Sequence, residues 1–266
     1  MKLMAVFALA LVVAATSGCK DKGKRQPPQG PAAGSAAVDP EMLQAREEFI
    51  ADIGAFSGMK RDDILYRITK NTGIADEWRE WEAKGPMTED RIKQFYKQTK
   101  FYSFDLASWH LWLADKWQSD KQLLVDLKSS GVKNVLDFGG GTGFNAFILA
   151  RGGLDVTLAD LDSVTLDFAR FRAERHGVKL KYWKSDVEPM PPDKKYDAIL
   201  CLDVLEHLPE KELQTTVDKL IQLKHAGTRL VIHAPFGRTS VHPMHLDLTP
   251  ETQHQIDRLQ RELPQQ

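Results

Sequence analysis

The sequence predicts an α/β fold in which a doubly wound, mostly parallel sheet follows a helical cap. Three observations predict it. An apolar run at 132–136 ends in Asp137 and a glycine-rich turn, which leads into an apolar segment at 144–150. Further apolar runs of strand length alternate with helical stretches as far as residue 263, whereas 41–130 shows only helical periodicity. Strands alternating with helices build a parallel, Rossmann-like sheet.

Length and composition limit the classes of protein to consider. The 266 residues, 42% of them hydrophobic, allow one domain of ordinary size plus an appendage. The net charge of −1 gives no basic field for nucleic acid, so no nucleic-acid partner is expected. Cys19 and Cys201 do not make a disulfide framework, and Cys201 lies inside an apolar run as a core residue.

The N-terminus has the features of an export signal. Lys2 precedes an apolar run at 3–15, and small residues then lead to Cys19. This resembles a bacterial lipoprotein signal at 1–18, with Cys19 lipidated and the protein membrane-anchored. A plain signal peptide remains open. So does an uncleaved anchor, because the basic residues after the apolar run would hold the rest of the chain in the cytoplasm.

The next two segments are a linker and a helical region. Residues 19–40 are rich in Pro, Gly, Ala and Lys and are expected to be a disordered linker. Residues 41–130 are expected to form a helical cap, with helices near 42–56, 62–69 and 74–83 and another opened by the hydroxyl of Thr88. The aromatic stripe at 103–117 indicates core packing, a cap that offers aromatic faces to the active site, or both.

The glycine turn restricts the ligand of the remaining domain, expected at 131–266. Gly141 and Gly143, followed by Ala146, fit the dinucleotide fingerprint, but a carboxylate at Asp137 would repel a pyrophosphate. The Asp137 carboxylate instead suits a ligand with positive charge. Asp137-x-Gly139-x-Gly141-x-Gly143 resembles the pattern of class I S-adenosylmethionine-dependent methyltransferases. That resemblance implies S-adenosyl-L-methionine as cofactor and these four residues at its site.

Two further strands end in carboxylates. The strand at 154–160 ends in Asp160, about 20 residues beyond the glycines, where an acidic side chain accepts hydrogen bonds from ribose hydroxyls. The strand at 180–186 ends in Asp186. The resemblance implies that Asp186 contacts the adenine amino group and that its neighbour Val187 covers the ring.

A fourth strand, at 196–203, leads into the segment with most of the expected chemistry. Asp203-x-x-Glu206-His207 resembles the Asp/Glu-x-x-Glu-His segment of methyltransferases related to the ubiquinone-biosynthesis O-methyltransferases. The resemblance implies that it faces the methyl group and that Asp203 belongs to the cofactor site. We expect His207, with an ordinary pKa near 6.5, to be the general base. Glu206 would orient it or bind a cation.

A fifth strand is expected at 227–233, and three histidines, His233, His242 and His245, lie near its end. Substrate hydrogen bonding or acid–base work is favoured over metal binding, because a proline stands between them and no matching ligand set accompanies them. No metal is therefore expected, and His245 is the second candidate base. A last helix is expected at 249–263. Members of the family usually add two more strands at this point, for which the sequence leaves no room. Either the sheet is short, or the chain is truncated, or the partner strands come from elsewhere.

Together these observations predict a methyltransferase that transfers a methyl group from S-adenosylmethionine to a hydroxyl or amine of a small molecule. The sulfonium is already a good leaving group, so catalysis is mostly positioning. One alternative keeps the fold without the chemistry, as a degenerate binding domain on a membrane-anchored protein. An NAD-linked oxidoreductase is disfavoured by Asp137 and by the missing second nucleotide-binding half. Neither the acceptor nor an oligomeric state follows from the residues.

Overall fold

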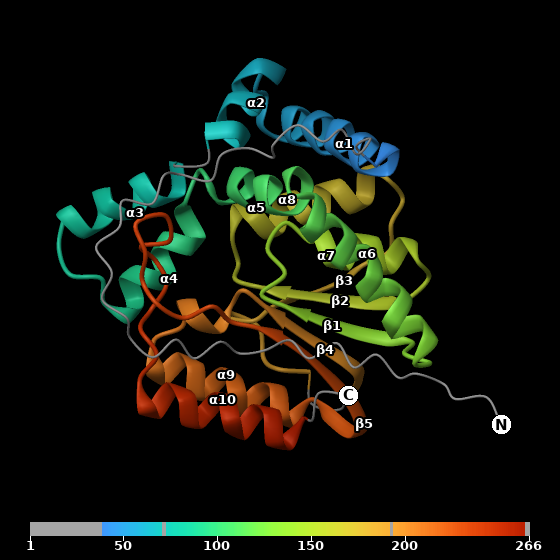
Figure 1. The fold of residues 1–266 in the computed structure, drawn as a ribbon, viewed down its shortest axis with the longest axis vertical. Helices are drawn as coiled ribbons and strands as arrows, with labels where there is room; N and C mark the ends of the chain where they lie inside the picture. The colour runs from blue at the N-terminus through green and yellow to red at the C-terminus, as the bar shows by residue number, and fades with distance from the viewer. Residues whose placement is uncertain (1–38, 71–72, 192–193, 264–266) are drawn as a thin grey trace. The chain divides into compact units, whose positions relative to one another are not determined.

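Five parallel strands form one sheet in the part of the chain that the structure, a computed structural model, describes, namely residues 39–70, 73–191 and 194–263. The strands are β1 (Asn134–Phe138), β2 (Asp155–Asp160), β3 (Lys181–Lys184), β4 (Tyr196–Leu202) and β5 (Lys224–His233). Their order is β3-β2-β1-β4-β5 (Figure 1). The chain winds outward from β1 to β3 and then crosses to β4 on the other side of β1. The predicted doubly wound sheet is confirmed.

Both faces of the sheet are buried, because successive strand side chains alternate between them. On one face, Leu136 and Ile199 belong to an apolar cluster with α9 (Glu210–Gln222) and α10 (Pro250–Glu262). On the other, Val135 and Ala198 cluster with α6 (Ala114–Ser129), α7 (Phe144–Arg151) and α8 (Val164–Arg175). Burial from both sides explains why β4 is almost continuously apolar in sequence.

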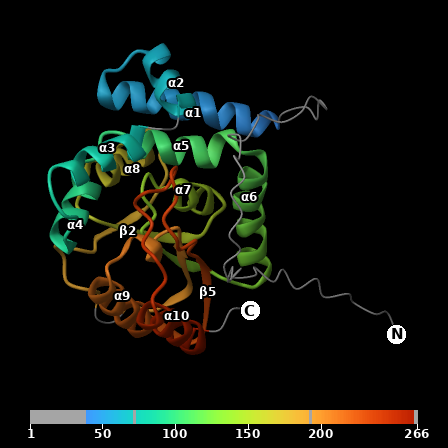
Figure 2. The same cartoon turned by 60° about the vertical axis from the view of Figure 1, so that its left-hand side comes forward.

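The helical region predicted at 41–130 ends with α6. Before α6 it consists of α1 (Pro40–Ser57), α2 (Arg61–Lys70), α3 (Gly73–Ala83), α4 (Glu89–Gln98) and α5 (Tyr102–Trp112). Figure 2 shows α1 and α2 above α5, with α3 and α4 to the left. The predicted cap at Thr88 is confirmed, since its hydroxyl accepts a hydrogen bond from the Arg91 N–H at 3.4 Å. The domain boundary at 130/131 stays a prediction.

Two apolar clusters join these helices to the rest of the chain. One brings α1, α2 and α5 against Phe144 of α7 and Phe168 of α8. The other brings α3 and α4 against Met244, which lies in the loop at 234–249 between β5 and α10. The helical region therefore contacts both the helices after the glycine turn and the loop after β5.

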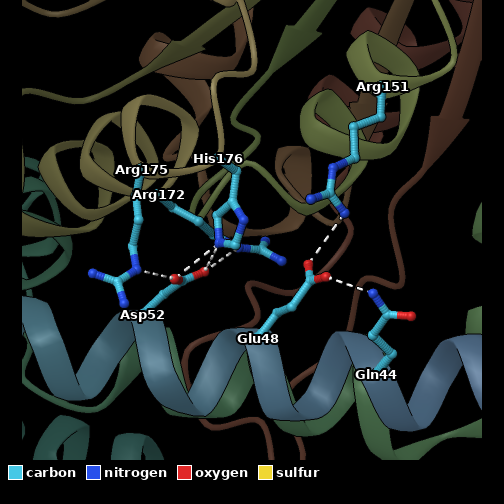
Figure 3. A network of polar contacts seen from close by, with 7 residues as sticks. All are labelled: Gln44, Glu48, Asp52, Arg151, Arg172, Arg175 and His176. Atoms are coloured by element: carbon cyan, nitrogen blue, oxygen red, sulfur yellow. Dashed lines mark hydrogen bonds and ion pairs between the residues drawn. The ribbon is translucent and has the colours of Figure 1, made fainter.

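A buried ionic network fixes α1 to α8 (Figure 3). Asp52 of α1 is 1% exposed and pairs with the Nε atoms of Arg172, at 3.3 Å, and Arg175, at 3.2 Å. It also accepts a hydrogen bond from His176 Nε2 at 2.9 Å. A second pair, Glu48 with Arg151 at 3.1 Å, lies at the more exposed rim. Because a charge as buried as Asp52 needs partners, the network specifies where α1 docks.

The remaining segments bear on the sequence predictions in two ways. Between β5 and residue 263, the described chain holds only the loop and α10, so the sheet gains no sixth strand there, as predicted. Among the described residues, no helix is both long and apolar enough to cross a membrane. The predicted signal at 1–18, Cys19 and the linker as far as residue 38 lie outside the described residues.

Candidate active site

The glycine turn connects β1 to α7 with three residues in the left-handed region of backbone space. Gly139, Gly141 and Gly143 have φ values of 71°, 55° and 70°. A Cβ on Gly139 would lie 2.4 Å from Cγ2 of Val204, which follows β4. The turn thus needs glycine both for its conformation and for the close approach of the two strand ends. The predicted strand–turn–helix unit is confirmed.

Asp137 lies behind this turn. Its side chain is 2% exposed, and Oδ2 accepts a hydrogen bond from the Ala146 N–H of α7 at 3.0 Å. Burial raises its pKa to about 7, although the hydrogen bond from Ala146 opposes this. The carboxylate is not among the residues that line the neighbouring cavity. In this structure it holds the turn in shape, which differs from the direct ligand contact expected from the sequence.

The cavity lies where the carboxyl ends of the strands meet, as expected for a doubly wound sheet. It has a volume of about 300 Å³. Its lining includes five predicted site residues from successive strand ends: Gly139, Asp160, Asp186, Asp203 and His207. The sequence therefore predicted the position of this cavity. Four other predicted site residues are not among those that line it, namely Gly141, Gly143, Glu206 and His245.

Asp160 is positioned by the backbone around it. Its Oδ2 accepts a hydrogen bond from the Gly141 N–H at 2.6 Å, and its Oδ1 accepts one from the Leu161 N–H at 2.7 Å. Burial raises its pKa to about 6, against these two hydrogen bonds. The carboxylate at the end of β2 is therefore fixed to the glycine turn and lines the cavity. A role in holding a ribose stays a prediction.

Asp186 connects the end of β3 to the helical cap. Its side chain is 3% exposed and pairs with Lys97 Nζ of α4 at 2.9 Å. Burial raises its pKa, but hydrogen bonds from Lys97 and from the Asp162 N–H outweigh this effect and leave the pKa lowered. Val187, by contrast, is 56% exposed and outside the cavity lining, so its predicted place over an adenine ring has no support here.

Asp203 ends β4 in an unusual conformation. It is the one described residue other than glycine with a positive φ, of 57°. Its N–H donates to the His233 carbonyl of β5 at 2.8 Å, and its carboxylate also bonds the His233 ring at Nδ1. Burial raises the pKa of Asp203, but the His233 hydrogen bond more than offsets this and the pKa is lowered. Strained backbone of this kind is typical of functional sites.

Glu206 is a buried carboxyl group without a hydrogen-bond partner. The residue is 0% exposed, and neither carboxylate oxygen has a hydrogen-bond partner among the described residues. Oε1 lies 3.8 Å from His207 Nε2. Burial raises its pKa to about 9, so the group is protonated at neutral pH. An unsatisfied buried carboxyl of this kind calls for an explanation such as catalysis or an ion. Its backbone carbonyl accepts the Leu246 N–H at 2.7 Å, which fixes the loop at 234–249.

His207 is less basic than the sequence suggested. Its Nδ1 shares a hydrogen bond of 2.8 Å with the Tyr96 hydroxyl of α4, and the backbone of Met244 also bonds the ring. Burial lowers its pKa to about 3, so the expected ordinary value near 6.5 is wrong. His245, whose ring centroid lies 4.9 Å away, has its pKa lowered by burial to about 4. Both imidazoles are neutral at pH 7.

Glu206, His207 and His245 nevertheless meet as a set. One ligand atom from each lies within 4.8 Å of the others, a grouping that could hold a metal ion. Two neutral imidazoles and a carboxyl with both oxygens unpartnered suit a divalent cation. The donor set therefore fits an ion. From the sequence, no metal was expected at the histidines after the fifth strand, whereas Glu206 was left open as a cation ligand.

Tyr96 and Tyr102 from the cap also line the cavity, and sequence reasoning did not name them. The aromatic stripe at 103–117 pointed to the right region. However, Phe104 and Trp117 within that stripe lie in the apolar core. Helical periodicity identifies a buried face but does not say which of its residues reach another element.

Comparison with known proteins decides the family of the central segment. Residues 135–227, from β1 into β5, match a family described as a methyltransferase domain. Residues 135–227 form a class I S-adenosylmethionine-dependent methyltransferase domain. The resemblance drawn from Asp137 and the glycines is thereby confirmed for this segment.

The curated relatives of the methyltransferase domain carry one name. The ubiquinone biosynthesis O-methyltransferase of Rickettsia conorii is 34% identical over 97 residues, which are 36% of this chain and 33% of the relative. That of Rickettsia felis is 39% identical over 97 residues, 36% of this chain and 39% of the relative. The chain thus spans between a third and two fifths of the length of these relatives.

A solved structure shows a looser similarity to the chain. The N-methyltransferase NodS from Bradyrhizobium japonicum, in complex with S-adenosyl-L-homocysteine, is 18% identical. The match covers 65% of this chain and 86% of NodS, with a TM-score of 0.48.

Proposed function

We propose that the protein transfers a methyl group from S-adenosylmethionine to a small-molecule acceptor. The observation that carries the proposal is the cavity at the strand ends of the methyltransferase domain, lined by Gly139, Asp160, Asp186 and Asp203. The glycine turn leaves room for a ligand to approach the backbone. Asp160 would accept hydrogen bonds from the ribose, and Asp186 would contact the adenine amino group.

Methyl transfer depends more on the positioning of acceptor and donor than on chemical activation. The acceptor atom attacks the methyl carbon in line with the departing sulfur, and the enzyme holds the two at about 3–3.5 Å. The cap contributes Tyr96 and Tyr102 to the cavity wall, where they would cover the bound donor and keep water out. Lys97, paired with Asp186, holds α4 over the end of β3.

We take a hydroxyl as the favoured acceptor and an amine as the alternative. The relatives matched over 97 residues are O-methyltransferases by name. The Asp203-x-x-Glu206-His207 segment resembles that group in sequence. A divalent cation held by Glu206, His207 and His245 would lower the pKa of an acceptor hydroxyl. The orphaned Glu206 carboxyl is the observation that favours such a cation.

The reaction can be tested with the full-length chain and S-adenosylmethionine labelled in its methyl group. The probes are 3,4-dihydroxybenzoate, which offers hydroxyls, and benzylamine, which offers an amine. We expect label on the dihydroxybenzoate, loss of transfer with EDTA and its return with Mg²⁺. Donor binding without transfer to either probe would instead favour the degenerate binding domain. Absence of donor binding would contradict the proposal.

For the N-terminus, we propose a lipid anchor on Cys19 that holds the protein at a membrane. The support is the order of Lys2, the apolar run at 3–15 and the small residues before Cys19. Cys19→Ser should leave an unprocessed precursor without the mass of the lipid. Equal mass and equal membrane fractionation of the two proteins would contradict the lipid anchor. A reporter fused after Pro40 and active only in the cytosol would support the uncleaved anchor instead.

A further inference from the structure

His233 ends β5 and forms a pair with Asp203, which lines the cavity, although His233 itself is not among the lining residues. The Asp203 carboxylate bonds the ring at Nδ1, and the Asp203 N–H donates to the His233 carbonyl at 2.8 Å. His233 is thus fixed both through its backbone and through its ring. The described residues offer no hydrogen-bond partner to its Nε2, and 42% of the side chain is exposed. A carboxylate-oriented imidazole with one free nitrogen is the arrangement of a general base.

The other two histidines of the site are less suitable. His207 is bonded through Nδ1 to Tyr96 and through the ring to the backbone of Met244, in a buried setting. His245 is bonded to the backbone of Pro235 and stacks on His242, with centroids 4.8 Å apart. Burial lowers the pKa of both rings, whereas the hydrogen bond to Asp203 raises the pKa of His233. A stronger base removes a proton more effectively.

We propose that His233, oriented by Asp203, is the general base that deprotonates the acceptor during methyl transfer. The inference rests on the proposed function and adds a catalytic residue to it. Asp203 acts as a positioning residue: it lines the cavity and determines which nitrogen of His233 is free.

The step balances without a further reagent. As the acceptor oxygen forms its bond to the methyl carbon, the carbon–sulfur bond breaks and its electron pair returns to sulfur, which becomes a neutral thioether. The hydroxyl proton moves to Nε2 of His233. The products are the methyl ether, S-adenosylhomocysteine and a protonated His233, which then loses its proton to water.

The charges that act on His233 come from three elements. Asp203 at the end of β4 raises the pKa of His233, while Lys116 of α6 lowers it. His245 of the loop at 234–249 is also electrostatically coupled to it, although its own pKa is lowered by burial. A sulfonium bound in the cavity, which Asp203 lines, would add a positive charge near the Asp203–His233 pair. The pKa of His233 should therefore report on the charge of the bound donor.

The same strand provides a control. His225 lies near the opposite end of β5 and pairs with Asp197 of β4 at 3.1 Å, much as His233 pairs with Asp203. Its other nitrogen accepts a hydrogen bond from the Gly227 N–H at 3.0 Å, so both nitrogens are engaged. Its partner Asp197 does not line the cavity at the strand ends, whereas Asp203, the partner of His233, does.

The test is a ¹⁵N-histidine NMR titration of the full-length protein, with resonances assigned through His233→Gln and His225→Gln. The protein is titrated free, with S-adenosylhomocysteine, and with sinefungin, which carries an ammonium where the donor carries its sulfonium. We expect the pKa of His233 to be about one unit lower with sinefungin than with S-adenosylhomocysteine. This is the effect of one positive charge about 6 Å away at an effective dielectric constant of about 50. The His225 resonance should not change.

Two variants complete the test. Asparagine tolerates positive φ, so Asp203→Asn should lower the pKa of His233 without loss of the fold. His233→Gln should leave the affinity for S-adenosylhomocysteine unchanged and, on an accepted probe, reduce kcat by about 10²–10⁴-fold. If both ligands bind and the His233 pKa is the same with each, the inference is overturned while the proposed function stands. If neither ligand binds, the proposed function itself fails.

Discussion

Individual carboxyl groups of this site differ in charge according to their partners. Asp137 and Glu206 are buried with too few hydrogen bonds, so their pKa values are raised. Asp186 and Asp203 are also largely buried, but Lys97 and His233 keep their pKa values low. Residue type and position in the sequence identified these groups. Their charge states depend on partners from other elements, which sequence spacing does not reveal.

The raised pKa of Asp137 predicts a pH-dependent stability that Asp137→Asn should remove. The pKa of Asp137 in the folded state is about 7 against an ordinary 3.8. The stabilisation from its preferential protonation in the folded state is therefore complete below about pH 4 and is lost as the pH rises through 7. Relative to the variant, the parent protein should lose about 2–3 kcal/mol of unfolding free energy between about pH 5 and pH 8. Urea denaturation at the two pH values measures this. Parallel losses in both proteins would show that Asp137 is not protonated in the fold.

At the scale of elements, the sequence predicted the strands, the glycine turn and the capped start of α4. Each follows from local chemistry, such as the Thr88 hydroxyl at a helix N-terminus. It did not predict that Tyr96, Lys97 and Tyr102 of the cap reach the strand ends. Nor did it predict the buried network around Asp52. Both depend on how helices dock, which periodicity alone leaves open.

The glycine turn gives a prediction with an internal control. Gly139→Ala forces a Cβ into Val204 at 2.4 Å and adds the strain of φ 71°. Gly153→Ala adds strain at φ 92° but meets nothing within 4 Å. Both should lose about 1–2 kcal/mol of stability through positive φ. Only Gly139→Ala should also weaken S-adenosylhomocysteine binding, by at least about tenfold in calorimetry. Equal affinity in both variants would contradict the role given to the turn.

The docking of α1 can be tested with Asp52→Asn. This change leaves the buried Arg172 guanidinium without its counter-charge, which typically costs about 3–5 kcal/mol. Glu48→Gln, at the rim of the same network, should cost less than about 1 kcal/mol. Chemical denaturation of the two variants gives the comparison. Similar small losses would mean that the buried pair is not what holds α1 in place.

For the whole molecule, the sequence predicted the doubly wound sheet and the edge at which its site lies. Asp160, Asp186 and Asp203 were each placed at a strand end, and parallel strands bring such ends together. The grouping of Glu206 and His207 with His245 was not foreseen. It requires the loop after β5 to fold back, through the hydrogen bond from the Leu246 N–H to the Glu206 carbonyl, toward a segment forty residues earlier.

The central claim, that the cavity binds S-adenosylmethionine, is tested most directly by isothermal titration calorimetry of the full-length protein. S-adenosylhomocysteine should bind at one site per chain, and NAD should give no heat. Asp160→Ala should weaken that binding by about 10- to 100-fold, because it removes hydrogen bonds to a charged group. Saturable binding of NAD with none of S-adenosylhomocysteine, or equal affinity in Asp160→Ala, would contradict the claim.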